Sequence, residues 1–389
     1  MTGLRLRLPT TDGTLTEHRL SGAEPIGPPP DPPRGRVAIA AAHVVADPLA
    51  DADPIVETRI DWDATLAWRR HLWGCGLGVA EAMDTAQRGM GLDWPSSLTL
   101  IRRAVAEANA VGGHIVCGAG TDQLIPGGTV DLDAVIAAYA EQFEAIEAAG
   151  GRIVMMASRA LAQCATSPED YTRVYGELLR QARKPVILHW LGDAFDPALA
   201  GYWGSSDLAT ACDVAIDVIA DNADAVDGVK VSVLDADVEV DLRRRLPHGV
   251  RCYTGDDFNF PDLIAGDEHH HSDALLGIFD AIAPVAASAL AALDAGDTDR
   301  YRDLLDPTVA LSRHVFGAPT YHYKTGLVFL AWLNGHQDHF RMIAGQESAR
   351  SAVHLAKLLV LADRARLLRD PELAASRMRT LLALSGIQG

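Results

Sequence analysis

The sequence lacks the residue patterns that mark several large classes of protein. Its five cysteines are scattered and odd in number, and none forms a C-x-x-C pair. That pattern argues against a disulfide framework or a zinc knuckle and favours a reducing compartment. No run approaches the roughly 18 apolar residues of a membrane span, and the opening residues MTGLRLR lack the apolar core of a signal peptide. We therefore expect a cytoplasmic protein.

Positive charge is also scarce. Lys and Arg number 34 against 52 Asp and Glu, which gives a formal charge of -18, and only four residues are lysine. A surface this acidic repels nucleic-acid backbones and anionic lipids. We expect no nucleic-acid or membrane partner, and a small molecule instead.

Residues 1–35 differ in pattern from the rest. Residues 4–8 and 14–20 alternate between apolar and polar side chains, and the tripeptide TDG between them is a turn signal. Residues 25–35 are rich in proline, which is typical of a linker. The sequence predicts a β-hairpin followed by a linker.

From residue 36 onwards, short apolar segments alternate with longer helical ones. The strands are expected at residues 36–45, 76–83, 114–118, 152–157, 185–190, 227–233, 250–254 and 274–279. Helices between them are expected at residues 62–72, 97–110, 132–149, 168–181, 208–222 and 261–265. This pattern is typical of a (β/α)₈ TIM barrel, of the α/β class, over residues 36–283. An open doubly wound sheet would need a glycine-rich turn after the first strand, and the segment HVVAD at 43–47 has none.

The region 284–389 contains no predicted strand. Helical stretches are expected at residues 284–295, 297–305, 329–345, 348–368 and 371–384, with prolines between several of them. We expect a C-terminal helical extension.

One lysine lies inside an apolar segment of strand length. Residues 227–233 read DGVKVSV, and burial penalises the charged form of Lys230. Either its amine emerges at a strand end, where Asp256 or Glu81 could pair with it, or it is a nucleophile with a lowered pKa.

Active sites of TIM barrels lie at the carboxyl ends of the strands. That rule selects a set of polar and aromatic residues: His43, Glu81, Asp84, Thr121, His189, Trp190, Lys230, Asp256 and Asp257. His189 is either a general acid/base or a hydrogen-bonded core histidine. Trp190 suits a pocket wall. The turn that holds Asp256 and Asp257 could hold its own loop, orient Lys230 or bind a cation.

A metal site is an open alternative. His43, Glu81, His189 and Asp256 could supply N and O ligands to a divalent metal, although no metal-binding spacing supports this. The consecutive histidines at 269–271 cannot all face one site, so we interpret them as a solvated loop.

Three stretches of residues 36–283 carry a resemblance to a known family. They are VCGAGT at 116–121, PVILHW at 185–190 followed by GVK at 228–230, and YTGDD at 253–257 followed by ALLGI at 274–278. Together they resemble the dihydrodipicolinate synthase / N-acetylneuraminate lyase superfamily of class I aldolase barrels, in a divergent subfamily of unknown function. The resemblance implies a Schiff-base lysine at Lys230, no metal or other cofactor, and a homo-oligomer, either dimer or tetramer.

The chain departs from that superfamily at its recognition groups. His189 stands where the superfamily has a tyrosine, AMDT at 82–85 replaces its carboxylate-binding segment, and GDAF at 192–195 replaces an arginine-bearing turn. We therefore expect an aldolase or lyase that acts on a keto acid or oxidised-sugar substrate. Lys230 would form the imine and His189 or Tyr202 would move protons.

The remaining selected residues would bind the substrate: His43, Glu81, Asp84, Thr121, Trp190, Asp256 and Asp257. The alternatives are a metal-dependent barrel lyase or isomerase and a non-catalytic barrel that binds a small molecule.

Overall fold

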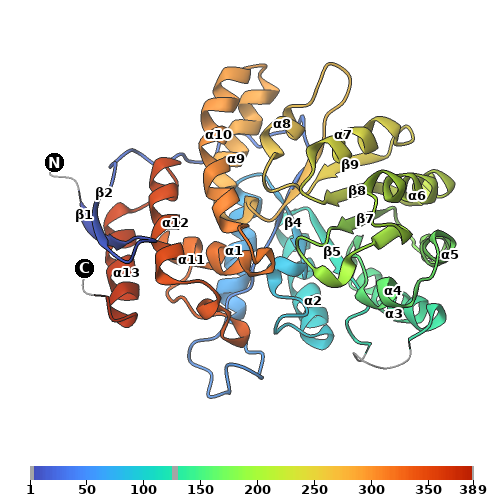
Figure 1. Cartoon of the computed structure of the whole chain (residues 1–389), viewed down its shortest axis with the longest axis horizontal. Coiled ribbons are helices and arrows are strands. Elements are labelled where there is room, and N and C mark those ends of the chain that lie inside the picture. The colour runs from blue at the N-terminus through green and yellow to red at the C-terminus, as the bar shows by residue number, and fades with distance from the viewer. Residues whose placement is uncertain (1–3, 125–129, 388–389) are drawn as a thin grey trace. The chain divides into compact units, whose positions relative to one another are not determined.

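The computed structural model describes residues 4–124 and 130–387. Eight parallel strands close into a barrel in the order β10-β3-β4-β5-β6-β7-β8-β9 (Figure 1). The strands are β3 (Ala38–Ala41), β4 (Gly78–Glu81), β5 (Ile115–Ala119), β6 (Ile153–Met155), β7 (Val186–Leu191), β8 (Val226–Ser232), β9 (Arg251–Thr254) and β10 (Asp273–Leu276). The predicted (β/α)₈ class is confirmed, and each strand coincides with a predicted one.

The interior of the barrel is closed by a ring of apolar side chains. Seven strands contribute to this ring: Ile39 and Ala41, Ala80, Val116, Val154, Ile187, Tyr253 and Leu275. The eighth strand, β8, contributes Gly228, which pairs in register with Ile187. A Cβ at Gly228 would lie 2.7 Å from the Tyr253 ring, so the glycine makes room for that ring. Because alternate residues of a strand face opposite sides, this ring fixes which positions point inward.

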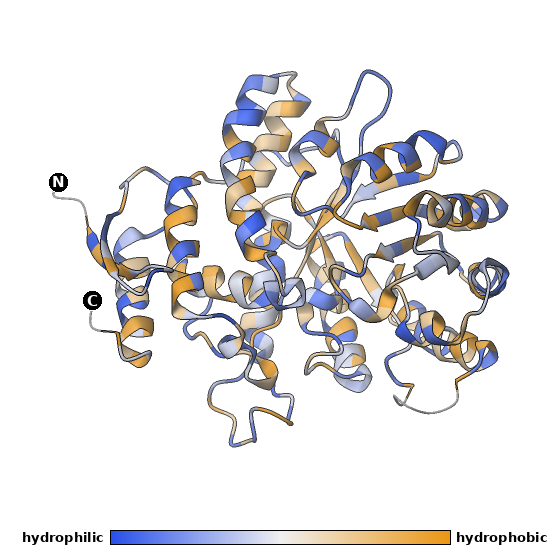
Figure 2. Cartoon of the chain, in the orientation of Figure 1, coloured by the Kyte–Doolittle hydropathy of each residue, from blue (hydrophilic) through white to orange (hydrophobic). Residues whose placement is uncertain are grey.

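Helices follow the barrel strands, and Figure 2 shows the strands themselves as largely hydrophobic. These helices are α2 (Trp94–Val111), α3 (Leu132–Ala148), α4 (Arg159–Cys164), α5 (Pro168–Leu179), α6 (Leu208–Asp221), α7 (Ala236–Arg245) and α8 (Phe260–Ala265). Aspartates cap four of them, since their carboxylates accept first-turn N–H groups. Sequence reasoning missed α4 and α7. No described helix is long and apolar enough to span a bilayer.

The chain divides into two compact units. The barrel unit comprises residues 36–42 and 77–277, and the second unit comprises 1–35, 43–76 and 278–389. Residues 43–76 and 278–283, which the sequence boundaries assigned to the barrel, therefore group with the terminal segments. The second unit contains β1 (Arg5–Pro9), β2 (Leu15–Arg19), α1 (Trp62–Gly74), α9 (Phe279–Asp294), α10 (Thr298–Val315), α11 (Tyr323–Leu333), α12 (Ala352–Arg364) and α13 (Pro371–Leu384).

Two prolines lie inside helices, although Pro307 was expected to separate helices and Pro284 was expected to begin one. Pro284 is within α9 and Pro307 is within α10. A proline ring clashes with the carbonyl four residues earlier, and α9 bends accordingly at Ile282, whose φ is -117°. The helix expected over 329–345 is also corrected, because α11 begins at Tyr323 and ends at Leu333.

The N-terminal hairpin is present as predicted. β1 and β2 pair antiparallel, and the side chain of Asp12 accepts hydrogen bonds from Thr10 and Thr14 in the turn. These bonds lower the pKa of Asp12 to about 2. Leu6 and Leu8 are buried, and β1 contacts α12 within the same unit.

A buried glutamate lies on α7 in the barrel unit. Glu239 is fully buried, and its Oε1 accepts a hydrogen bond from the Ser272 hydroxyl at 2.6 Å. Burial raises the pKa of Glu239 to about 8, and the nearby charge of Asp256 adds to the rise. The carboxyl group is therefore neutral in the folded protein at pH 7 and charged in the unfolded chain.

Glu239 therefore makes the stability of the barrel depend on pH. The folded state retains this proton from about pH 4.5 to about pH 8, whereas the unfolded chain loses it. The contribution of Glu239 to the free energy of unfolding therefore falls as pH rises through that window. We expect Glu239→Gln to raise the free energy of unfolding at pH 8 by a few kcal/mol, with little change near pH 4.5. Urea unfolding at several pH values measures this. The exposed Glu144→Gln is the control, and an equal pH slope in both variants would contradict the expectation.

Candidate active site

Lys230 projects from the inner face of the barrel. It lies on β8 two residues after Gly228, so both residues face the same side of the strand. Gly228 belongs to the ring of apolar side chains, which places Lys230 one layer closer to the carboxyl ends of the strands. This is the end at which barrel enzymes hold their catalytic groups.

The Lys230 amine is buried, without a close partner in the described part of the chain. The residue is 8 % exposed, and no hydrogen bond or ion pair reaches its amine from the residues that the structure describes. Burial lowers the pKa of Lys230, while the carboxylates of Asp257 and Asp84 oppose that fall. The neutral form of the Lys230 amine therefore becomes populated at a lower pH than that of an exposed lysine.

His189 is the neighbour of Lys230 on the adjacent strand. The two residues pair in register between β7 and β8, and His189 follows Ile187 on the inner face. Burial holds the pKa of His189 well below its usual value, and the charge of Lys230 lowers it further. The imidazole is therefore neutral, able to accept a proton at one nitrogen and to donate one from the other.

The two nitrogens of His189 differ in their contacts. Nε2 lies 3.2 Å from the Ser232 hydroxyl, while Nδ1 is buried without a hydrogen-bond partner in the described part of the chain. Ser232 follows Lys230 by two residues and faces the same side of β8. Sequence reasoning missed Ser232, although this spacing was a signal that could have found it.

Gly255 leaves room for the Lys230 and Ser232 side chains because it has no side chain of its own. A Cβ at this position would lie 2.1 Å from Ser232 Oγ and 2.8 Å from Lys230 Cε. Both side chains therefore occupy the space that any larger residue would need. The amine, the hydroxyl and the imidazole form one group, which we call the Lys230 cluster: Lys230, His189 and Ser232.

Carboxylates surround this cluster unequally. Asp84 and Asp257 act electrostatically on Lys230, so both lie in its neighbourhood. Asp256 instead holds its own loop, because its carboxylate accepts from the backbone N–H groups of Phe258 and Asn259 and from the Asn259 side chain. Of the three aspartates expected at the site, two therefore act on the lysine and one shapes the loop.

Glu81 and Trp190 lie on the opposite face of their strands from the Lys230 cluster. Glu81 follows the inward-facing Ala80, and its charge acts on Cys117. Its Oε1 accepts from the backbone of Ala82. Trp190 follows His189 and packs against Trp203 at a ring distance of 6.5 Å. Strand alternation thus directs both side chains away from the barrel interior.

Thr121 and Tyr202 belong to a separate cluster of hydroxyl groups. Thr121 Oγ1 lies 2.6 Å from Ser158 Oγ, and the Ser158 backbone N–H donates to the Tyr202 hydroxyl at 3.2 Å. That hydroxyl also lies 2.9 Å from the hydroxyl of Tyr175, and burial raises the pKa of Tyr202 to about 12. Among the described residues, no hydrogen bond links this cluster to Lys230.

His43 forms hydrogen bonds with buried residues of the second unit. Its Nδ1 contacts Asp280 Oδ2 at 2.6 Å, and its Nε2 contacts Gln337 Oε1 at 3.2 Å. Asp280 also accepts from the Trp68 indole at 2.6 Å and is fully buried. Both ring nitrogens of His43 are therefore engaged within this unit.

The described ranges contain no group of three or more His, Cys, Asp or Glu side chains arranged to hold a metal ion. The histidines at 269–271 are exposed in a loop, as their interpretation as a solvated segment predicted. Two of their backbone N–H groups donate to Asp267, which anchors that loop.

The comparisons with known proteins identify the family. A family model described as "Protein of unknown function (DUF993)" matches residues 6–387, nearly the whole chain. The chain belongs to the DUF993 family. A search of curated protein sequences finds no match for this DUF993 protein.

Solved structures show which known fold this DUF993 protein shares. The dihydrodipicolinate synthase of Aquifex aeolicus is 14 % identical, with a TM-score of 0.64, and the match covers 86 % of this chain and 99 % of that one. The 4-hydroxy-tetrahydrodipicolinate synthase of Methylacidiphilum fumariolicum SolV is 13 % identical, with a TM-score of 0.64 and coverage of 89 % and 99 %. The dihydrodipicolinate synthase of Bacteroides thetaiotaomicron is 15 % identical, with a TM-score of 0.63 and coverage of 84 % and 99 %. At these identities the likeness establishes a common fold.

The pKa of Lys230 can be tested without knowing a substrate. Only a neutral amine attacks formaldehyde in reductive methylation, and the pKa of Lys230 is lowered by burial. We expect its methylation to reach half-maximum at a lower pH than that of the exposed Lys184. Mass spectrometry of the four lysine-containing peptides over a pH series measures both midpoints. A midpoint for Lys230 equal to that of Lys184 would contradict the assignment.

Proposed function

We propose that this DUF993 protein is a lyase of the class I aldolase type, in which Lys230 forms a Schiff base with a keto acid or oxidised-sugar substrate. One observation carries the proposal: the buried amine has no ion-pair partner among the described residues and lies beside a neutral imidazole and a hydroxyl. A lysine that served only as a structural ion pair would be expected to contact a carboxylate.

The chemistry follows from the amine. The neutral Lys230 nitrogen attacks the carbonyl carbon of the substrate, and the carbonyl oxygen leaves as water after gaining two protons. The resulting iminium withdraws electrons from the neighbouring carbon. A carbon–carbon or carbon–oxygen bond at the adjacent position can then break, and hydrolysis of the imine releases the product and restores the amine.

We assign the proton transfers to His189, with Ser232 as its relay. His189 Nε2 lies 3.2 Å from Ser232 Oγ, and the same hydroxyl lies next to Lys230 Cε in the space beside Gly255. A neutral imidazole has a lone pair on one nitrogen that can accept a proton and an N–H on the other that can return one. Tyr202 is less suited to this role, because its hydroxyl bonds to Tyr175 and Ser158.

The charges near Lys230 favour a hydroxylated substrate. Asp84 and Asp257 act on the lysine, and carboxylates accept hydrogen bonds from hydroxyl groups but repel a substrate carboxylate. This supports an oxidised sugar, with hydroxyl groups beside its carbonyl, over a small acid such as pyruvate. Dihydrodipicolinate synthesis itself is not proposed, since the solved synthases share the fold at 13–15 % identity. We further propose that the chain acts as a homo-oligomer in the cytoplasm.

Borohydride trapping tests the Schiff base. The protein is incubated with dihydroxyacetone, a hydroxylated 2-oxo acid or pyruvate, and the imine is reduced to a stable amine. We expect a mass adduct on Lys230. The fraction of labelled protein should be higher with the hydroxylated compounds, because Asp84 and Asp257 can accept hydrogen bonds from their hydroxyl groups. Peptide mapping identifies the modified lysine.

Two variants control this experiment. Lys230→Ala should abolish the adduct, and Lys184→Ala, which alters an exposed lysine, should leave it unchanged. Labelling that persists in Lys230→Ala would overturn the proposal. Turnover that a chelator abolishes, without an adduct, would support the metal-dependent alternative, and ligand binding without either would support a non-catalytic barrel.

The proton-transfer role of His189 has its own test. In His189→Gln we expect the adduct to persist, while deuterium exchange at the carbon next to the substrate carbonyl slows by roughly 10²–10⁴-fold, the usual contribution of a general base. Ser232→Ala should slow exchange by a smaller factor, since water can replace the hydroxyl. NMR in D₂O measures the exchange.

The matched control is His271→Gln, which changes an exposed histidine of the solvated loop. Its exchange rate should equal that of the unmodified protein. Exchange that continues at full rate in His189→Gln would remove His189 from the mechanism while leaving the Lys230 imine intact.

A further inference from the structure

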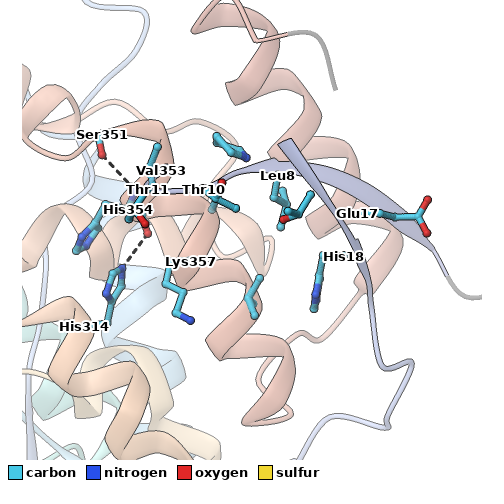
Figure 3. A pocket seen from close by; sticks show the side chains of 14 residues that line it. Leu8, Thr10, Thr11, Glu17, His18, His314, Ser351, Val353, His354 and Lys357 are labelled. Atoms are coloured by element: carbon cyan, nitrogen blue, oxygen red, sulfur yellow. Dashed lines mark hydrogen bonds between the residues drawn. The ribbon is translucent and has the colours of Figure 1, made fainter. Parts of the chain in front are cut away.

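A cavity lies in the unit that does not contain Lys230. It encloses about 570 Å³ between the hairpin β1–β2, the start of α12 and His314 of α10 (Figure 3). Cavities of roughly 300–1,000 Å³ are typical of small-molecule sites. The residues that line it are all in the second unit, and none belongs to the Lys230 cluster. We call it the hairpin pocket.

Two stacked histidines give the hairpin pocket a flat surface. The rings of His314 and His354 lie 4.0 Å apart with an angle of 19° between their planes. The His314 Nε2–H donates to the backbone carbonyl of His354 at 3.1 Å, which fixes the orientation of the first ring. Such a rigid aromatic pair suits stacking against a planar ligand.

Both imidazoles of the pair are neutral. Burial lowers the pKa of His314, and burial together with the His314 ring lowers the pKa of His354 to about 3. The positive charges of Arg350 and Lys357 contribute to these shifts. The stacking surface therefore carries no charge of its own at pH 7.

One cation of the pocket is left without a partner. Lys357 is exposed on α12, and within the described ranges no ion pair or hydrogen bond involves its ammonium. The other charged groups are engaged: Glu17 pairs with Arg5 at 2.9 Å and extends away from the histidines, and His18 lies 3.4 Å from Asp363 (Figure 3). Lys357 is therefore the lining cation that an anionic ligand could pair with, on a chain of formal charge -18.

The remaining lining is partly apolar. Leu8, Val353 and Val360 contribute aliphatic surface, and Ser351 caps the N-terminus of α12 by accepting from the His354 N–H. The positive end of this helix adds to the attraction for an anion that Lys357 already provides. A fully hydrated inorganic anion would leave the flat and aliphatic surfaces unused.

We propose that the hairpin pocket binds a small, flat organic carboxylate, with its ring or conjugated system stacked on an outer ring face of the His314–His354 pair and its carboxylate at Lys357. The charge and the flat surface select this class together. The site is independent of the function proposed for Lys230, since the two share no residue.

Binding to the full-length protein tests this site. The probes are benzoate, its uncharged analogue benzamide, the non-planar cyclohexanecarboxylate and inorganic phosphate, measured by calorimetry or ligand-observed NMR. We expect benzoate to bind and the other three to bind at least about tenfold more weakly, since each lacks the charge or the flat surface. Equal binding of phosphate, or no binding of benzoate, would overturn the proposal.

Variants assign the binding to this pocket. Lys357→Gln should weaken benzoate about tenfold or more through loss of the cation. His354→Leu should also weaken it, while His354→Phe, which retains an aromatic ring, should preserve it and shows that the helix still folds. Lys184→Gln and Lys230→Ala should leave it unchanged. Benzoate affinity that survives both Lys357→Gln and His354→Leu would place the binding elsewhere and reject the site.

Discussion

Desolvation of the Lys230 amine is the constraint on which the arrangement at the carboxyl ends of the barrel strands depends. Strand β8 directs Lys230 into an interior that apolar side chains close on the other side. An ammonium ion in that position loses hydration, so burial lowers the pKa of Lys230. Burial, and to a smaller extent the charge of Lys230, holds the pKa of His189 well below its usual value. The chemistry available at this end of the barrel therefore follows from where the chain puts one side chain.

Much of the fold could be predicted, because the buried strands of a parallel barrel are short apolar runs separated by long crossovers. The errors have local causes. Helix α7 carries many charged side chains in the sequence ADVEVDLRRR, so its apolar pattern is weak and only its cap at Asp235 marks it. Pro307 was interpreted as a helix break, but tertiary packing retains it inside α10.

The candidate site was less predictable for a geometric reason. Strand-end position selected Lys230 and His189 together, and they do pair in register. Position at a strand end could not show which side chains point into the barrel, since a shift of one residue turns every side chain of a strand to the other face. Glu81 and Trp190 therefore fell into the same set as Lys230 although they point the other way. Ser232 was overlooked because its signal was only its spacing of two residues from Lys230, and that spacing indicates a shared face rather than a chemical role.

The contacts of the N-terminal hairpin with α12 affect how the chain folds during translation. Ser21 bonds to Asp363 across 342 positions of the chain, and the whole barrel segment is encoded between them. During translation β1, which bears Leu6 and Leu8, is synthesised before the barrel, but α12, which β1 contacts, is synthesised after it. At ordinary elongation rates that delay is on the order of tens of seconds. The nascent N-terminus must therefore stay soluble while the barrel folds, and a truncated chain would leave those leucines exposed.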